Sequence, residues 1–256
     1  MSDALLEIRE LSRSFGGLKA VNDVSFTVQA GSIKSVIGPN GAGKTTLFNL
    51  ISGMLPSDSG FVLQNGQEIT RLQPYRIAEL GISRTFQTTK LFSRMSVLEN
   101  VMVGRHTRTK AGFLSGVLNL PWTWKEEREI RERSLALLDA LGLAEVAGEV
   151  ASNLPFGKQR LLEIARALAA EPSLLLLDEP AAGLNIYETR EMADLVLKIR
   201  GWGITVLLVE HDMSLVMDIS DEIVVLNYGR KVAEGAPAEI QRDPEVIRIY
   251  LGGGHA

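Results

Sequence analysis

Short apolar runs alternate with amphipathic segments along much of the chain, and this alternation predicts an α/β fold. Ser32–Ile37, Leu174–Asp178 and Ile204–Val209 are apolar-rich runs that are too short for typical helices. Such runs are typical of strands that are buried on both faces. Glu188–Arg200, between the last two runs, has the spacing of an amphipathic helix. Because strands separated by helices pair in parallel, we expect a mainly parallel core sheet.

A second group of segments has the pattern of antiparallel strands. Leu5–Arg9 reads as a strand, and apolar and polar residues alternate from Val24 to Val28. Asn65-Gly66 separates two short apolar segments, and this dipeptide is typical of a tight hairpin turn. Asn227–Gly229 separates two further strands in the same way. We therefore expect an antiparallel β subdomain and a hairpin near the C-terminus.

Between the hairpin and the leucine run at 174–177 the pattern changes to that of helices, which predicts a separate helical subdomain. The helices expected there and in the C-terminal tail are Pro74–Leu80, Val97–Val103, Lys125–Leu141, Gly157–Ala170, Pro237–Gln241 and Pro244–Leu251. The whole chain is predicted to be one domain over residues 1–256. Its expected parts are a core with the β subdomain at about 1–86 and 172–236, the helical subdomain at about 87–171 and the tail at about 237–256.

Composition narrows the classes of function. The net charge is −4 and the pI is near 5.6, so the chain lacks the basic footprint of a nucleic-acid-binding protein. It contains no cysteine, which excludes disulfides and cysteine-bound metals. The N-terminus lacks the features of a signal peptide, and no apolar run reaches the roughly 18 residues of a membrane span. We expect a cytoplasmic protein whose membrane role, if it has one, comes through a partner.

The most specific motif is a phosphate-binding loop. Residues 38–45 fit the pattern Gly-x-x-x-x-Gly-Lys-Thr, between a predicted strand and a predicted helix. The loop directs backbone N–H groups and the positive end of a helix dipole at one point. Lys44 is then predicted to reach the β- and γ-phosphates of ATP, and the Thr45 hydroxyl to bind Mg²⁺. The predicted nucleotide-binding residues of this loop are Gly38, Asn40, Gly41, Gly43, Lys44, Thr45 and Thr46.

Polar side chains follow three other predicted strands. Asp178 and Glu179 come directly after four leucines, which places two carboxylates at the sheet edge that carries the phosphate loop. Asp178 is suited to holding Mg²⁺, and Glu179 to deprotonating the attacking water. Gln87 and His211 also follow predicted strands, where Gln87 would contact Mg²⁺ and water and His211 the γ-phosphate. The alternatives are a surface glutamine and a structural histidine.

The order of these elements resembles the ATP-binding cassette of ABC transporters over essentially the whole chain. The resemblance implies a P-loop NTPase fold with a RecA-like core, and it matches Gln87, Asp178-Glu179 and His211 to the family's catalytic motifs. Phe15 falls where the family places an aromatic ring against adenine, and its alternative is a core aromatic. The family's Leu-Ser-Gly-Gly-Gln signature, which contacts the partner's ATP, is Leu154–Lys158 here. Leu154, Gly157 and Lys158 are therefore predicted nucleotide contacts, although Pro155 replaces the usual serine.

Several segments are similar to the LivG-type ATPases of branched-chain amino acid importers, among them Glu210–Met213 and Tyr250–Gly252. The resemblance implies integral-membrane permease subunits, a second ATPase subunit (a paralogue or a second copy) and, indirectly, a periplasmic cargo-binding protein. The subunit would then lie on the cytoplasmic face of the inner membrane. The extra segment at 105–124 also fits this type, and it either faces the membrane or packs on its own lobe.

Other functions stay open at this point. The same ATPase could serve another cargo, such as urea, amides or aromatic acids, or a lipopolysaccharide exporter. A soluble ABC protein of translation or DNA repair is a further alternative. Those proteins usually carry two cassettes or long coiled-coil arms, and this chain has neither.

Overall fold

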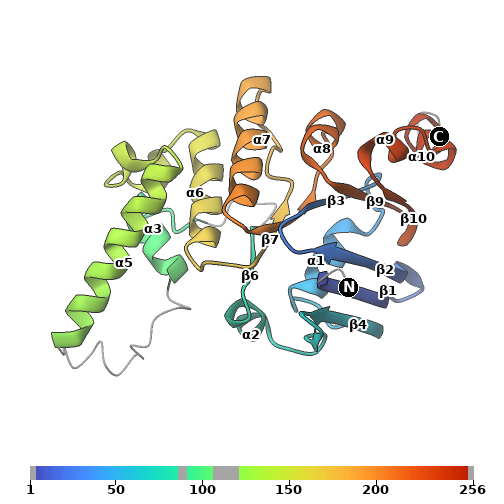
Figure 1. The fold of residues 1–256 in the computed structure, drawn as a ribbon, viewed down its shortest axis with the longest axis horizontal. Coiled ribbons are helices and arrows are strands. Elements are labelled where there is room, and N and C mark those ends of the chain that lie inside the picture. Colours follow the sequence, from blue (N-terminus) through green and yellow to red (C-terminus); the bar gives the residue numbers. More distant parts are fainter. Residues whose placement is uncertain (1–3, 86–90, 106–120, 253–256) are drawn as a thin grey trace. The chain divides into compact units, whose positions relative to one another are not determined.

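The computed structural model describes residues 4–85, 91–105 and 121–252 (Figure 1). The chain forms two compact units, and each is described by itself. The first unit contains residues 1–84 and 173–256, and the second contains residues 85–172.

The first unit is built on a six-stranded, mainly parallel sheet with the strand order β10-β9-β3-β8-β7-β6. Its strands are β3 (Ile33–Ile37), β6 (Ile82–Arg84), β7 (Leu174–Asp178), β8 (Thr205–Val209), β9 (Glu222–Asn227) and β10 (Arg230–Gly235). All residues of β3, β7 and β8 are buried, as their apolar runs predict. Only β10 runs antiparallel, because it returns from β9 through the predicted turn at 227–229.

A four-stranded antiparallel sheet with the order β2-β1-β4-β5 packs against one face of this sheet. Its strands are β1 (Ala4–Phe15), β2 (Leu18–Gln29), β4 (Ser59–Gln64) and β5 (Gln67–Glu68). One apolar cluster contains residues of both sheets and of helix α1 (Lys44–Ile51), including Leu6, Phe48 and Leu176. Helix α1 therefore contributes to the core that joins the two sheets.

The opposite face of the parallel sheet is covered by helices near the C-terminus. Successive strand residues point to opposite faces, so Val36 belongs to the first cluster and Ile37 to a second one. The second cluster includes Val216 and Val246 from two of these helices. The helices of the first unit are α2 (Pro74–Glu79), α7 (Ile186–Gly201), α8 (Met213–Ile219), α9 (Pro237–Ile240) and α10 (Pro244–Gly252). Helix α8 was not predicted from the sequence.

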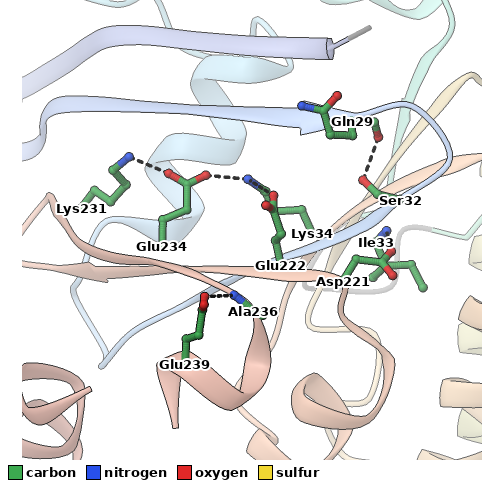
Figure 2. Close-up of polar contacts among 10 residues, drawn as sticks. All are labelled: Gln29, Ser32, Ile33, Lys34, Asp221, Glu222, Lys231, Glu234, Ala236 and Glu239. Atoms are coloured by element: carbon green, nitrogen blue, oxygen red, sulfur yellow. Dashed lines mark hydrogen bonds and ion pairs between the residues drawn. The ribbon is translucent and has the colours of Figure 1, made fainter. Parts of the chain in front are cut away.

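A polar cluster lies at the amino end of strand β3 (Figure 2). Lys34 is only 1% exposed, and its Nζ contacts carboxylate oxygens of Glu222 at 2.8 Å and Glu234 at 2.6 Å. Lys231 donates to the other oxygen of Glu234 at 2.6 Å. Burial tends to raise the pKa of Glu234, but hydrogen bonds from Lys231 and Lys34 outweigh it and keep that pKa below its usual value. The cluster therefore joins β3, β9 and β10 through charge-assisted bonds.

The second unit is helical, as predicted. Its elements are α3 (Val97–Gly104), α5 (Pro121–Ala140), the 3₁₀ helices η2 (Ala144–Val146) and η3 (Ala151–Asn153), and α6 (Phe156–Leu168). Helices α3 and α6 approach closely at Gly104, where an added Cβ would lie 2.1 Å from the carbonyl oxygen of Arg166. Most of the segment at 105–124 lies outside the described residues, so its role stays a prediction. In the described ranges, no helix has both the length and the apolar character needed to cross a membrane.

Candidate nucleotide-binding site

The phosphate loop joins the end of β3 to the start of α1, and its glycines are required by close packing. Gly38 has φ 152° and Gly43 has φ 104°, which side-chain-bearing residues rarely adopt. An added Cβ at either glycine would lie 2.2 Å from a backbone carbonyl oxygen, that of Leu226 or of Ala20. The loop geometry predicted from the glycine spacing is therefore present.

Two later segments also contact this loop. Gly229, in the turn between β9 and β10, donates its N–H to the carbonyl of Ala42 at 2.9 Å. Tyr250 of α10 is hydrogen-bonded to the backbone of Gly38, while burial raises its pKa to about 12. The sequence predicted the turn and the helix but not their contacts with the loop.

Lys44, the first residue of α1, is held inside the loop. Its side chain is buried, and its Nζ donates to the carbonyl oxygens of Gly38 at 2.7 Å and Pro39 at 3.1 Å. Burial lowers its pKa, while the nearby charges of Glu179 and Asp178 act in the opposite direction. Lys44 thus lies within electrostatic reach of both carboxylates predicted for catalysis. A phosphate would give this desolvated ammonium a further negative partner.

Asp178 ends strand β7 and forms an ion pair that the sequence analysis missed. Its carboxylate is 1% exposed, and its Oδ2 accepts from Arg84 Nη2 at 2.8 Å. The other nitrogen, Nη1, donates to the side chains of Asn49 at 2.7 Å and Ser52 at 2.9 Å. Arg84 thereby connects Asp178 to helix α1. A signal was available, because an arginine ends the short edge strand β6 beside β7.

Glu179 and His211 come together at the ends of two adjacent strands. His211 Nε2 lies 2.7 Å from Glu179 Oε1. The two strands pair up to Asp178 and Val209, and the Glu179 N–H then donates to the Val209 carbonyl at 2.9 Å. Glu179 itself has φ 51°, a left-handed conformation that costs energy for a residue with a side chain. The predicted catalytic glutamate and histidine therefore share one hydrogen bond.

Phe15 lies at the tight turn between β1 and β2. Its side chain is 45% exposed, so the alternative of a core aromatic is wrong. The guanidinium carbon of Arg13 lies 5.1 Å from the ring centroid, so Arg13 forms a cation–π contact with the ring. The predicted contact of Phe15 with adenine stays a prediction.

The oxygen atoms near the loop fit a magnesium ion. Mg²⁺ usually takes one or two protein ligands together with phosphate oxygens and water. Thr45 is exposed at the start of α1, and Asp178 supplies a buried carboxylate at the end of β7. Over the described ranges no group of three or more His, Cys, Asp and Glu forms a metal site. Gln87, the third predicted ligand, lies outside the described residues.

The predicted signature segment lies in the second unit, at the start of α6. The helix begins at Phe156, one residue before the predicted start, because Pro155 has φ −54° and ψ 151° and forms the N-cap. Leu154 is buried and its carbonyl accepts from Gln159, so it stabilises this helix start. Gly157 is half-buried and Lys158 is exposed. Their contacts with a nucleotide stay predictions.

Comparisons with known proteins agree with this geometry. A family model described as ABC transporter matches residues 21–182, and one described as branched-chain amino acid ATP-binding cassette transporter matches residues 230–256. The chain is 46% identical over 253 residues to the high-affinity branched-chain amino acid transport ATP-binding protein LivG of Escherichia coli (strain K12), covering 98% of this chain and 99% of LivG. It is 45% identical to BraF of Pseudomonas aeruginosa, with the same coverage.

A solved structure gives the same result for the fold. The ADP conformation of MJ1267, an ATP-binding cassette of an ABC transporter, matches with a TM-score of 0.85 and 34% identity over 97% of this chain and 99% of that one. The predicted α/β P-loop fold is therefore confirmed. The chain is therefore an ATPase that belongs to the ABC transporter family, in the group that contains LivG and BraF.

Proposed function

We propose that this ATPase drives the import of branched-chain or related amino acids through an integral-membrane permease. The observation that carries the proposal is the similarity to LivG and BraF over 98% of the chain. The match over residues 230–256 supports it, because that family model is described by the same class of transporter.

For hydrolysis we assign the base to Glu179, which takes a proton from the attacking water. His211 lies within hydrogen-bond distance of Glu179 and would orient it and contact the γ-phosphate. Lys44 would bind the β- and γ-phosphates. Thr45, Asp178 and Gln87 would hold Mg²⁺, which supplies positive charge against the phosphates when it is bound. Phe15 would contact the adenine ring.

Two such subunits would close head to tail, with each ATP held between one phosphate loop and the partner's signature segment. Leu154, Gly157 and Lys158 would contribute that trans contact, aided by the N-terminal backbone amides of α6. The second subunit is either a paralogue or another copy of this chain. The pair would sit on the cytoplasmic face of the inner membrane beneath its permease, supplied by a periplasmic cargo-binding protein.

The test is uptake by the transporter purified from native membranes and reconstituted in vesicles with ATP inside. We expect radiolabelled leucine or a related amino acid to accumulate in the wild-type vesicles. Glu179→Gln keeps the shape of the side chain but removes the base, so turnover should fall by about 10²–10⁴-fold while ATP binding survives. Glu191→Gln, an exposed change on α7, is the matched control and should transport normally.

Two outcomes would contradict different parts of the proposal. Hydrolysis at the wild-type rate by Glu179→Gln would show that this residue is not the base. Uptake of urea, amides or aromatic acids instead, or export of lipopolysaccharide, would reassign the cargo but keep the ATPase. Co-fractionation with ribosomes or DNA rather than with membranes would contradict a transport function altogether.

A further inference from the structure

Glu210 is a buried carboxylate next to the catalytic residues. It follows the last residue of β8 and is only 3% exposed. Its Oε1 accepts the N–H of Ala181 at 2.8 Å. Its Oε2 accepts the N–H groups of His211 at 2.8 Å and, more weakly, Asp212 at 3.4 Å. The two oxygens therefore bind backbone groups from two different loops.

Those two loops carry the groups assigned to hydrolysis. Ala181 lies two residues after Glu179, and His211 directly follows Glu210. The strand pairing of β7 with β8 ends at Asp178 and Val209, and the backbone bond from the Glu179 N–H to the Val209 carbonyl extends it by one residue on the β7 side. The Glu210 carboxylate continues the connection by hydrogen bonds. A loop that contains Glu179 in a left-handed conformation needs such support from its surroundings.

The charge of Glu210 matters for this arrangement. Among the described residues Glu210 forms no ion pair, so backbone N–H groups provide its stabilisation. A carboxylate accepts at both oxygens, whereas an amide accepts at one atom and donates at the other. Glutamine at this position would therefore set an N–H donor against the N–H of one of the two loops. A buried donor left in that state weakens the connection.

We propose that Glu210 is a positioning residue, which holds Glu179 and His211 in register by joining their two loops. The inference rests on the proposed roles of Glu179 and His211. It predicts that the 2.7 Å contact between Glu179 Oε1 and His211 Nε2 depends on the Glu210 carboxylate. ATP binding depends instead on the phosphate loop, which Glu210 does not contact in the described hydrogen bonds.

The experiment measures ATP hydrolysis by the assembled transporter carrying Glu210→Gln. We expect kcat to fall by about 10- to 100-fold, because small displacements of catalytic groups have effects of this size. The KM for ATP and the affinity for a fluorescent ATP analogue should stay within about twofold, since uniform binding is not altered. Loss of kcat with unchanged KM separates positioning from damage to the nucleotide site.

Glu234→Gln is the control for a merely structural effect. Glu234 is a partly buried carboxylate of the same unit, but it binds Lys34 near the amino end of β3, whereas the phosphate loop follows the carboxyl end. This variant should lower the melting temperature. It should leave kcat within about twofold, because sites that are far apart and share no partners act independently of each other. If Glu210→Gln loses stability but retains its kcat in the same way, the inference is overturned.

Two further variants make every outcome decisive. If Glu210→Gln does not fold, Glu210→Asp replaces it, because it keeps the charge but shortens the reach between the loops. Its kcat should still fall well below that of Glu234→Gln, and wild-type turnover would overturn the inference. Glu179→Gln separates the inference from the proposed function. If Glu179→Gln is inactive and Glu210→Gln is fully active, the positioning role of Glu210 is refuted, whereas the proposed role of Glu179 stands.

Discussion

Replacing Arg84 by methionine tests whether Asp178 depends on its buried cation. The change keeps most of the side-chain length and removes the guanidinium. It leaves Asp178, which is 1% exposed, without a contact that measures 2.8 Å in the wild type. It also removes the hydrogen bonds that Arg84 donates to Asn49 and Ser52.

The expected loss follows from the burial of both partners, which are 7% and 1% exposed. Removing one partner of a buried ion pair typically costs about 3–5 kcal/mol, since the other charge stays in a medium that solvates it poorly. For a protein of this size, that corresponds to a fall of roughly 6–20 °C in melting temperature. Arg13→Met is the matched control. Its ion pair with Asp58 is 24% and 43% exposed, so its loss should be about 1 kcal/mol or less.

The assay is denaturant unfolding of the isolated subunit without nucleotide, followed by circular dichroism. Arg84→Met, Asp178→Asn and the double variant form a cycle, in which we expect a coupling energy of about 1–3 kcal/mol. The double variant should thus be more stable than the sum of the single losses implies. The reasoning is refuted if Arg84→Met loses no more stability than Arg13→Met, or if the cycle is additive.

Three further predictions follow from other parts of the molecule. Glu234, whose pKa lies below the usual 4.5, stabilises the fold above that pH, and this contribution is lost as the pH falls through the lowered pKa. In an acid titration followed by fluorescence, the free energy of unfolding of the wild type should therefore start higher and decrease more steeply with falling pH than that of Glu234→Gln. Parallel curves would contradict this. Phe15→Ala should weaken binding of a fluorescent ATP analogue by about 1–3 kcal/mol, whereas unchanged affinity would remove Phe15 from the site. Gly157→Asp should block hydrolysis in the assembled transporter by placing a carboxylate beside the partner's phosphate, while the isolated subunit still binds ATP. Normal hydrolysis by that assembled variant would show that 154–158 is not the trans contact.

The sequence predicted those features that depend on local rules. Strand β7 has the predicted bounds Leu174–Asp178, because its four leucines are buried on both faces and the carboxylate of Asp178 ends the apolar run. The phosphate loop was predictable because its glycines are demanded by backbone geometry at Gly38 and Gly43. Helix α8 was missed because seven residues give little periodic signal. Its start was marked by Asp212, which accepts from the N–H groups of the first turn.

Contacts between distant residues could not be read from the sequence. Lys34 was placed in a buried strand, but its partner Glu234 lies 200 residues further along the chain. Arg84 and Asp178 are 94 residues apart and meet only because β6 pairs with β7. Local patterns predict that a segment is buried, whereas the partner of a buried charge depends on the strand order. The strand order follows from the whole fold.

The strand order also explains how the strand ends that carry the proposed catalytic residues meet at one edge of the sheet. Each strand end is tied to a neighbouring element by a buried polar contact beyond the sheet hydrogen bonds. Arg84 of β6 binds Asp178 of β7, Glu210 after β8 binds the loop after β7, and Gly229 after β9 binds the phosphate loop after β3. Backbone N–H groups are the donors in two of these three ties, those of Ala181 and Gly229. The strand ends that carry the residues proposed for catalysis are thus joined to one another by contacts between neighbouring elements as well as by the sheet.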